Sequence, residues 1–438
     1  MDNKVVTRFP PSPTGLLQMG NIRTALYNYL FSRQNSGKFI VRIEDTDKER
    51  SKKEYEKAIF SDLKWLGLEY DGEVLKSSDR TEIYKKKLHE LIEKGFAYIS
   101  QETEGENREV VRFKNPGGEI KFQDLIRGEV TMDVSDLKDF IIARNINDPI
   151  YHLAVCVDDL ASGITHVIRG EDHISNTPRQ ILIIEALGGV RPIYAHIPLI
   201  LAQDKSKLSK RKHGETASLK YYIDKGYLSE AIINFLALIG WNPGGEQEIF
   251  TLDELIKEFD FSKVQKGGGI LNIEKLDWLN KEHMKRMPQE EIEKSILAHL
   301  PEGMQDKTIA RRLVPIIFDR ISKWADVKEM AEKEELDFFF KPPAIDKAKL
   351  IYKKTAPEKI TKNLHLAIQA LENISENNFT AEDIKNSLMT IADSLENRGE
   401  LLHPVRYALS GADKSPDPFL IAATIGKNET LSRLKKAI

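Results

Sequence analysis

The apolar residues at the start of the chain follow two different periods. Short β-branched and apolar runs at residues 5–9 and 39–43 predict two strands. Between them, from Asn21, apolar residues recur at the spacing of one helix face until Gly37 ends the pattern. A strand, a helix and a second strand in this order predict that the two strands are parallel.

The same reasoning extends through the first half of the chain. Residues 51–54 read as a capping box and predict the start of a helix. Short alternating segments at 108–144 predict a small β-rich module inserted into the α/β pattern. The pattern then resumes with a strand at 164–169, a helix at 177–188 and a further parallel strand at 197–201.

Downstream of about residue 215 the strand pattern nearly vanishes. Residues 231–239 form an apolar helical run, and residues 314–438 carry only amphipathic helical periodicities with short breaks. The chain is therefore expected to be α/β in its first half and all-helical in its last third.

Composition narrows the class of protein. A chain of 438 residues is long enough for about three domains. The chain has 65 Lys and Arg residues and 68 Asp and Glu residues, so its formal net charge is −3. Any polyanion must therefore bind a local basic patch. No apolar run approaches the length of a membrane span, and a single cysteine, Cys156, excludes an internal disulfide. With no apolar secretion segment at the N-terminus, we expect a soluble, cytoplasmic protein.

Two loops carry candidate chemistry, because ligands bind beyond the carboxyl ends of parallel strands. The loop after the first strand brings Gly20 to the start of a helix, where free N–H groups favour a phosphate. Residues 204–214 place five cations within eight residues. Taken alone, such a glycine is more often structural, and such a loop is more often simply exposed. Together they favour a phosphate-bearing ligand.

These two loops carry a specific resemblance. Residues 12–21 resemble the HIGH signature of class I aminoacyl-tRNA synthetases, and residues 207–211 resemble their KMSKS signature. The branch that the chain resembles is the bacterial-type glutamyl-tRNA synthetases, from about Val5 to the C-terminus. Four further segments carry that likeness, at residues 42–47, 157–159, 167–178 and 404–411.

The resemblance implies a Rossmann-type class I synthetase catalytic domain with an inserted small α+β module, followed by an all-helical anticodon-binding region. The expected domains are the first half of the catalytic domain, an inserted module that binds the acceptor end, the second half of the catalytic domain, a stem-contact helical domain and a helical anticodon-binding domain. Their expected bounds, in that order, are residues 1–80, 81–150, 151–215, 216–313 and 314–438.

The implied activity is ATP-dependent activation of L-glutamate, with Mg²⁺, and transfer of the glutamyl group to the 3′ end of tRNA(Glu), releasing AMP and pyrophosphate. Activation depends on positioning and on stabilising charge on phosphate oxygens. The residues expected to carry it are Lys210, Lys207, Gln18 and Gly20. The residues expected to bind ATP are Ser12, Thr14, Gly15, Gln18, Gly20, Asn21, Lys207, Leu208, Ser209, Lys210 and Arg211.

Glutamate recognition is expected to rest on two arginines. A fixed guanidinium suits the side-chain carboxylate of glutamate. Arg8 and Arg169 match the residues that recognise this carboxylate in the family, although either could equally belong to a structural ion pair. Glu44 matches the residue that receives the α-ammonium, while Ser12 and Tyr151 match others that line the pocket. A buried arginine left unpaired would disfavour glutamine, by about 10⁴-fold.

The chain departs from the family pattern in several places. Gln18 stands where most members have histidine, and a neutral amide can donate to a phosphate but cannot carry charge. Residues 100–109 are short and free of cysteine, so we expect no zinc. A turn at residues 372–376 lacks the arginine that favours discrimination between tRNAs, which leaves tRNA(Gln) open as a second substrate. The expected partners are tRNA, glutamate and ATP, with no membrane and with the chain acting as a monomer.

Two other classes of function compete with this interpretation. The chain could be a binding module that retains tRNA affinity but has lost catalysis through Gln18. The basic loop together with Arg8, Glu44 and Arg169 argues against that alternative. A small nucleotidyltransferase of the same fold would not need the two hundred or so residues that follow the basic loop.

Overall fold

The computed structural model describes residues 4–102, 109–304 and 307–438. It divides into two compact units, Met1–His283 and Met284–Ile438. Each unit buries apolar side chains of its own. Within the described ranges, no helix combines the length and the apolar character needed to cross a membrane.

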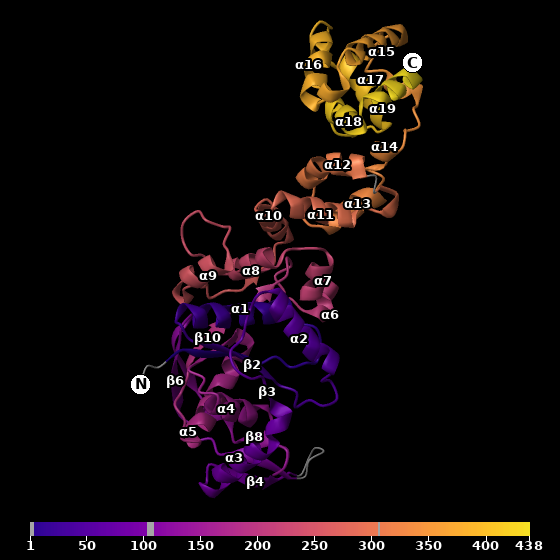
Figure 1. Ribbon diagram of the computed structural model, residues 1–438. Coiled ribbons are helices and arrows are strands. Elements are labelled where there is room, and N and C mark those ends of the chain that lie inside the picture. The colour runs from indigo at the N-terminus through magenta and orange to yellow at the C-terminus, as the bar shows by residue number, and fades with distance from the viewer. Residues whose placement is uncertain (1–3, 103–108, 305–306) are drawn as a thin grey trace. The chain divides into compact units, whose positions relative to one another are not determined.

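The first unit opens with the predicted strand, helix and strand. β1 (Val6–Phe9) pairs in parallel with β2 (Lys38–Ile43), and α1 (Met19–Gln34) connects them (Figure 1). The chain turns from α1 into β2 at Gly37, where an added Cβ would lie 2.1 Å from the carbonyl oxygen of Val5. Only glycine allows this close approach of two backbone segments.

Two sheets meet where β1 lies beside β9. The first sheet has the order β1–β2–β3, and the second has the order β7–β6–β10–β9, in which β9 (His166–Gly170) and β10 (Ile193–Ile197) are parallel. The amide of Thr165 donates to the carbonyl of Val6 at 3.1 Å, so β9 starts level with β1. The carboxyl ends of β1, β2 and β9 therefore open onto one edge.

The short strands predicted within residues 108–144 are present but belong to two different sheets. β4 (Ala97–Gln101), β5 (Glu109–Phe113) and β8 (Phe140–Ala143) form an antiparallel sheet. β6 (Glu119–Asp124) and β7 (Gly128–Asp133) form a hairpin that joins the second sheet, where Asp124 lies opposite Tyr194 of β10. The hairpin thus reaches the strands that carry the candidate site.

Two local predictions were wrong. The capping box expected at residues 51–54 is absent, because α2 (Lys53–Trp65) begins after Lys52 and the buried Ser51 hydroxyl has no hydrogen-bond partner among the described residues. The strand expected at residues 197–201 is interrupted, because β10 ends at Ile197 and β11 (Ile200–Leu201) pairs with β12 (Gly269–Ile270) instead. Pro198 stands at this break and has no N–H to continue a ladder.

Helices cover the sheets of the first unit. α1 packs on β1, β2 and β9 and also on α8 and α9, so it is buried on opposite sides (Figure 1). Apolar residues of α1, of the strands and of α8 form one continuous core. The remaining helices and strand are β3 (Leu75–Lys76), α3 (Thr81–Glu93), α4 (Tyr151–Ala161), α5 (Thr177–Ala186), α6 (Lys210–His213), α7 (Leu219–Asp224), α8 (Ser229–Leu238), α9 (Leu252–Glu258) and α10 (Ile273–Met284).

The second unit is helical throughout its described residues, as the periodicity predicts. The buried Arg433 links three of its helices, because its Nη1 donates to the carbonyls of Phe338 at 2.6 Å and Leu409 at 2.7 Å. The helices are α11 (Gln289–His299), α12 (Lys307–Arg320), α13 (Ala325–Glu332), α14 (Asp337–Phe340), α15 (Pro357–Glu372), α16 (Ala381–Ala392), α17 (Gly399–Ser410), α18 (Pro418–Ile425) and α19 (Lys427–Ala437).

Candidate active site

A cavity of about 680 Å³ opens at the carboxyl ends of β1, β2 and β9. The loop that follows β1, the start of α1 and the basic loop after β11 form its other walls. The predicted site residues that line it are Arg8, Ser12, Thr14, Gly15, Gln18, Gly20, Asn21, Glu44, Tyr151, Arg169, Lys207, Leu208 and Lys210. Ser209 and Arg211 do not line it. Ser209 instead precedes the short helix α6, and Arg211 is exposed on that helix.

The loop between β1 and α1 is held by backbone hydrogen bonds. The amide of Glu44 donates to the carbonyl of Pro11, and the amide of Lys52 donates to the carbonyl of Pro13, both at 3.0 Å. A Cβ built on Gly15 or on Gly20 would meet no protein atom within 4 Å. Neither glycine is therefore required by its neighbours in the protein, and the open space beside both faces the cavity.

The basic loop is partly tied down by acidic residues. The ammonium of Lys207 lies 2.8 Å from Asp172, and that of Lys212 lies 2.7 Å from Asp204. Across the described ranges, Lys210 forms no ion pair. Its ammonium is thus available to a ligand in the cavity that it lines.

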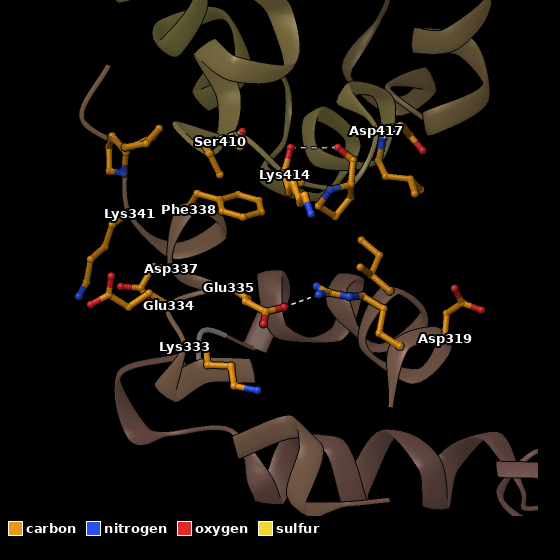
Figure 2. Close-up of a pocket in the computed structure, with 18 of the residues that line it drawn as sticks. Asp319, Lys333, Glu334, Glu335, Asp337, Phe338, Lys341, Ser410, Lys414 and Asp417 are labelled. Atoms are coloured by element: carbon orange, nitrogen blue, oxygen red, sulfur yellow. Dashed lines mark hydrogen bonds and ion pairs between the residues drawn. The ribbon is translucent and has the colours of Figure 1, made fainter. Parts of the chain in front are cut away.

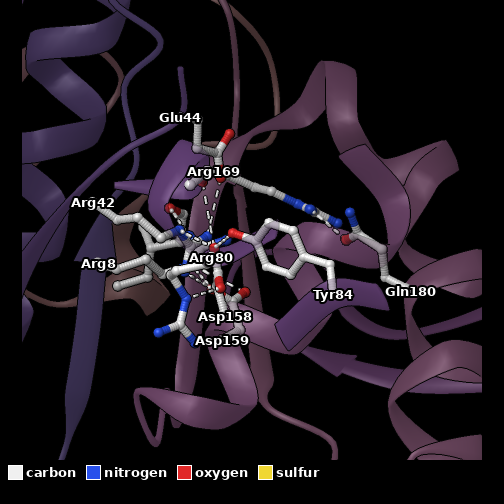
Figure 3. A network of polar contacts seen from close by, with 11 residues as sticks. Arg8, Arg42, Glu44, Arg80, Tyr84, Asp158, Asp159, Arg169 and Gln180 are labelled. Atoms are coloured by element: carbon white, nitrogen blue, oxygen red, sulfur yellow. Dashed lines mark hydrogen bonds and ion pairs between the residues drawn. The ribbon is translucent and has the colours of Figure 1, made fainter. Parts of the chain in front are cut away.

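A buried ion network supports the inner end of the cavity. The fully buried Arg42 donates to Asp159 at 2.8 Å and to Glu44 at 3.0 Å, and Arg8 Nε lies 3.3 Å from Asp159 (Figure 3). Burial alone would raise the pKa of Asp159, but Arg8 and Arg42 outweigh it and hold that pKa below its ordinary value. Asp159 is therefore an anion that fixes both arginines in place.

Burial has the opposite net effect on Glu44. It raises the pKa of this carboxyl, and Arg42 only partly opposes the rise. The second oxygen of Glu44 is left for a donor inside the cavity, since only Oε1 faces Arg42. A buried carboxylate in this setting gains from any cation that binds beside it.

The adjacent Asp158 ties this network to α3. Its carboxylate accepts from Arg80 Nε at 2.6 Å and from the Tyr84 hydroxyl at 2.6 Å (Figure 3). Sequence reasoning named neither these partners nor Arg42 as site residues. Two neighbouring aspartates inside the apolar helix α4 were the available signal, because buried carboxylates need cationic or hydrogen-bonding partners.

Arg169 differs from Arg8 and Arg42 because its described partners are all neutral. Its guanidinium donates to the Gln180 amide oxygen at 2.7 Å, to the Thr177 hydroxyl at 2.7 Å and to His196 Nε2 at 3.3 Å. Figure 3 shows it extending past the carboxylates towards Gln180. Burial lowers its pKa. A buried guanidinium that lines a cavity without a carboxylate is a site for an anionic ligand group.

Several lining residues were not foreseen. They include Asp172 and His173, which follow β9, together with Arg23 of α1 and Tyr55 of α2. Their positions follow from tertiary packing, although the segment 167–178 that contains the first two was recognised as a motif.

The described residues contain no group of three or more His, Cys, Asp or Glu placed to hold a metal ion. Residues 103–108, on which the expectation of no zinc partly rests, lie outside the described ranges, as do residues 1–3 of the N-terminus. The absence of zinc stays a prediction. Mg²⁺ in the expected reaction accompanies ATP as part of the substrate.

The second unit has a larger cavity, of about 1390 Å³, between α12, α14 and the segment after α17. Figure 2 shows charged side chains around it, among them Lys333, Lys341 and Lys414, with Phe338 on its wall. Arg320 and Glu335 form an ion pair across part of this surface. Four cations and five acidic side chains line this cavity, so its charge indicates no particular class of ligand.

The fold and the site define a class I aminoacyl-tRNA synthetase. The family described as tRNA synthetases class I (E and Q), catalytic domain, matches residues 4–109 and 100–278, and the family described as anticodon binding domain matches residues 277–438. Because curated glutamate–tRNA ligases match the chain over nearly its whole length at 34–40% identity, it belongs within this class to the glutamate–tRNA ligase family.

Relatives and solved structures support that assignment along nearly the whole chain. The chain is 40% identical to a glutamate–tRNA ligase of Thermodesulfovibrio yellowstonii over 99% of both chains, and 36% identical to glutamate–tRNA ligase 1 of Alkalilimnicola ehrlichii over 99% of this chain and 98% of the relative. Among solved structures it is similar to a glutamate tRNA ligase from Elizabethkingia meningosepticum in complex with its amino acid, with a TM-score of 0.85, 31% identity and 99% of each chain covered.

Proposed function

We propose that this chain activates L-glutamate with ATP and transfers the glutamyl group to the 3′ end of tRNA(Glu). The single observation that carries the choice of amino acid is the Arg169 guanidinium, which lines the cavity and has only neutral partners among the described residues. Glutamate brings a second carboxylate that would neutralise it. Glutamine would leave the buried charge unpaired, which is the kind of mismatch that binding sites reject strongly.

The amino-acid end of the cavity binds two of the three charged groups of glutamate and leaves the α-carboxylate to react with ATP. Arg8 and Arg169 receive the side-chain carboxylate, and Glu44 receives the α-ammonium through the oxygen that does not face Arg42. Ser12 and Tyr151 complete the walls. The pairing of Arg8 with Asp159 orients this arginine but leaves Arg169 as the stronger source of uncompensated positive charge.

The ATP end is formed by the two loops. Gly15 and Gly20 leave open space for the nucleotide, while Thr14, Gln18 and Asn21 offer polar groups along it. From the basic loop, Lys207 and Lys210 contact the phosphates and Leu208 packs against the nucleotide. Ser209 and Arg211 belong to the same loop and come into contact with ATP when the loop moves on ATP binding.

Both chemical steps are displacements that depend on positioning. An oxygen of the α-carboxylate of glutamate attacks the α-phosphorus of ATP, and pyrophosphate leaves with the electron pair of the broken P–O bond. The terminal ribose hydroxyl of tRNA then attacks the glutamyl carbonyl carbon, loses its proton and releases AMP. Lys210, Lys207, Gln18 and the N–H groups near Gly20 stabilise charge on the phosphate oxygens in the first step.

The rest of the chain binds tRNA. In this proposal residues 1–80 and 151–215 form the catalytic domain, and residues 81–150 contact the acceptor end. Residues 216–313 contact the stem and residues 314–438 the anticodon, and the match of residues 277–438 to the anticodon binding domain supports the latter role. The chain acts as a monomer, and tRNA(Gln) remains a candidate second substrate.

The test is charging with radiolabelled glutamate, ATP and Mg²⁺ on purified tRNA(Glu) and tRNA(Gln). Lys210→Ala should lower charging of tRNA(Glu) by at least about 100-fold, as loss of one preorganised charge donor does. Lys220→Ala is the matched control, because Lys220 lies outside the cavity and pairs with Asp224. Binding of tRNA without any charging by the unaltered protein would favour the binding module instead.

A further inference from the structure

A buried pair of side chains stands behind Arg169. Asp124 comes from the hairpin β6–β7, and His196 lies opposite Arg169 in the parallel register of β9 and β10. The two side chains are fully buried, and His196 Nδ1 lies 2.7 Å from an oxygen of Asp124. That same oxygen accepts from the backbone amide of His196 at 3.0 Å.

The geometry defines the tautomer of His196. Nδ1 faces a carboxylate, so it carries the proton and donates, while Nε2 faces the Thr177 hydroxyl at 3.0 Å and Arg169 Nε–H at 3.3 Å and therefore accepts. Burial lowers the pKa of His196, and its bond to Asp124 only partly opposes this effect. Burial would raise the pKa of Asp124, but hydrogen bonds from His196 and from the amides of Ile126 and Arg127 outweigh it and lower that pKa.

A neutral imidazole in this place has a specific consequence for Arg169. The guanidinium has five N–H donors, and neutral acceptors on His196, Gln180, Thr177 and the carbonyl of His173 take four of them. The imidazole orients the guanidinium as a carboxylate would, but it keeps the negative charge of Asp124 one ring further away. Arg169 thus keeps its charge for a ligand.

We propose that Asp124 and His196 are positioning residues that hold Arg169 in place, without neutralising it, for the side-chain carboxylate of the substrate. This inference rests on the proposed function, because it concerns how the same site distinguishes glutamate from glutamine. Neither residue lines the cavity, so neither acts by touching the substrate.

The first test is Asp124→Asn. The amides of Ile126 and Arg127 both donate to Asp124 Oδ1 at 2.9 Å, so they fix the amide oxygen of the new side chain there. Its NH₂ group then faces both the backbone N–H and Nδ1 of His196. The proton of the imidazole is forced onto Nε2, where it meets the Thr177 hydroxyl and the N–H of Arg169. We expect the KM for glutamate in aminoacylation to rise about 10- to 100-fold, with the KM for ATP unchanged.

The second test compares two replacements of His196. His196→Gln supplies an oxygen that can accept from Arg169, whereas His196→Leu removes the acceptor. We expect the KM for glutamate to increase from the unaltered protein to His196→Gln and further to His196→Leu, and the preference for glutamate over glutamine to fall in the same order. His166→Gln, three residues before Arg169 on β9 and outside the cavity, is the matched control and should leave both quantities unchanged.

The outcomes separate the two proposals. If the unaltered protein does not charge glutamate, the proposed function fails. If it does, and Arg169→Ala abolishes glutamate selectivity while Asp124→Asn and His196→Leu alter the KM for ATP and for glutamate equally, the positioning role is overturned and the pair only stabilises the fold. Thermal unfolding of each variant identifies any loss of folded protein.

Discussion

The ammonium of Lys207 and the carboxylate of Asp172 form an ion pair with an N–O distance of 2.8 Å. Lys207 belongs to the basic loop, and Asp172 follows β9 on the opposite wall of the cavity. Both side chains are about half exposed, at 55% and 44%. The cation proposed to contact the phosphates of ATP is thus paired with an acid, and ATP must compete with Asp172 for it.

Asp172→Asn should therefore strengthen ATP binding. Exposed pairs contribute up to about 1 kcal/mol, so we expect the KM for ATP to fall by up to about fivefold at low salt and by less at about 0.5 M salt. Steady-state aminoacylation at both salt concentrations measures this. Asp204→Asn, which releases Lys212 in the same loop but outside the cavity, is the control. An unchanged or increased KM for ATP at low salt would contradict the prediction.

Gln18 is expected to act as a neutral donor to phosphate. Its side chain lines the cavity at the start of α1, where the family most often has histidine. Gln18→Ala should lower kcat by about 10²-fold, in line with the loss of one preorganised donor, while Gln18→His should stay within about threefold of the unaltered protein. Single-turnover adenylate formation measures both variants. Equal rates for the unaltered protein and the Gln18→Ala variant would remove the side chain from the mechanism.

His152 should make the first unit sensitive to acid. Burial, reinforced by Arg179, Arg169 and His173, lowers its pKa to about 4. An unfolded histidine titrates near about 6.5, so stability is fully present above about pH 6.5 and is lost as the pH falls towards about 4. After allowance for partial exposure, we expect a loss of about 1–2 kcal/mol over that range. His152→Gln should lose less on acidification, which thermal unfolding midpoints at about pH 7.5 and about pH 4.5 would reveal.

Local sequence patterns predicted the elements and the residues that end on one sheet edge. Arg8 and Arg169 were identified because each stands near the carboxyl end of a predicted strand and matches, by the family resemblance, a residue that recognises the side-chain carboxylate. The periodicity of α1 and the Gly37 stop likewise follow from short-range rules. The broken strand at Pro198 was a missed signal and not a limit of such rules, because a proline has no N–H to continue a ladder.

The ion pairs and hydrogen bonds that determine the charge of each site residue could not be predicted from local sequence patterns. Arg42 and Asp159 are 117 residues apart in the chain, and Asp124 and His196 are 72 apart. Their pairing depends on which strands become neighbours, including a hairpin from the predicted insertion that joins the main sheet. Sequence reasoning could name the charged residues but could not tell that Asp159 neutralises Arg8 while Arg169 has only neutral partners.

A substitution at Gly20 should change ATP binding without lowering the stability of the fold. It is the second residue of α1, its φ is not positive, and an added Cβ would meet no protein atom within 4 Å. Gly20→Ala should therefore leave stability unchanged or raise it by up to about 1 kcal/mol, because alanine loses less entropy on folding. If the open space is where ATP phosphates approach the helix start, the same methyl group should raise the KM for ATP by at least about tenfold.

Gly267→Ala is the matched control for this substitution, since it also adds a methyl group in open space with an ordinary φ but lies outside the cavity. It should leave the KM for ATP unchanged. Thermal unfolding and ATP titration in aminoacylation would be measured on both variants. A stable Gly20→Ala protein with an unaltered KM for ATP would mean that the nucleotide does not approach the start of α1. The phosphates would then have to bind through the basic loop alone.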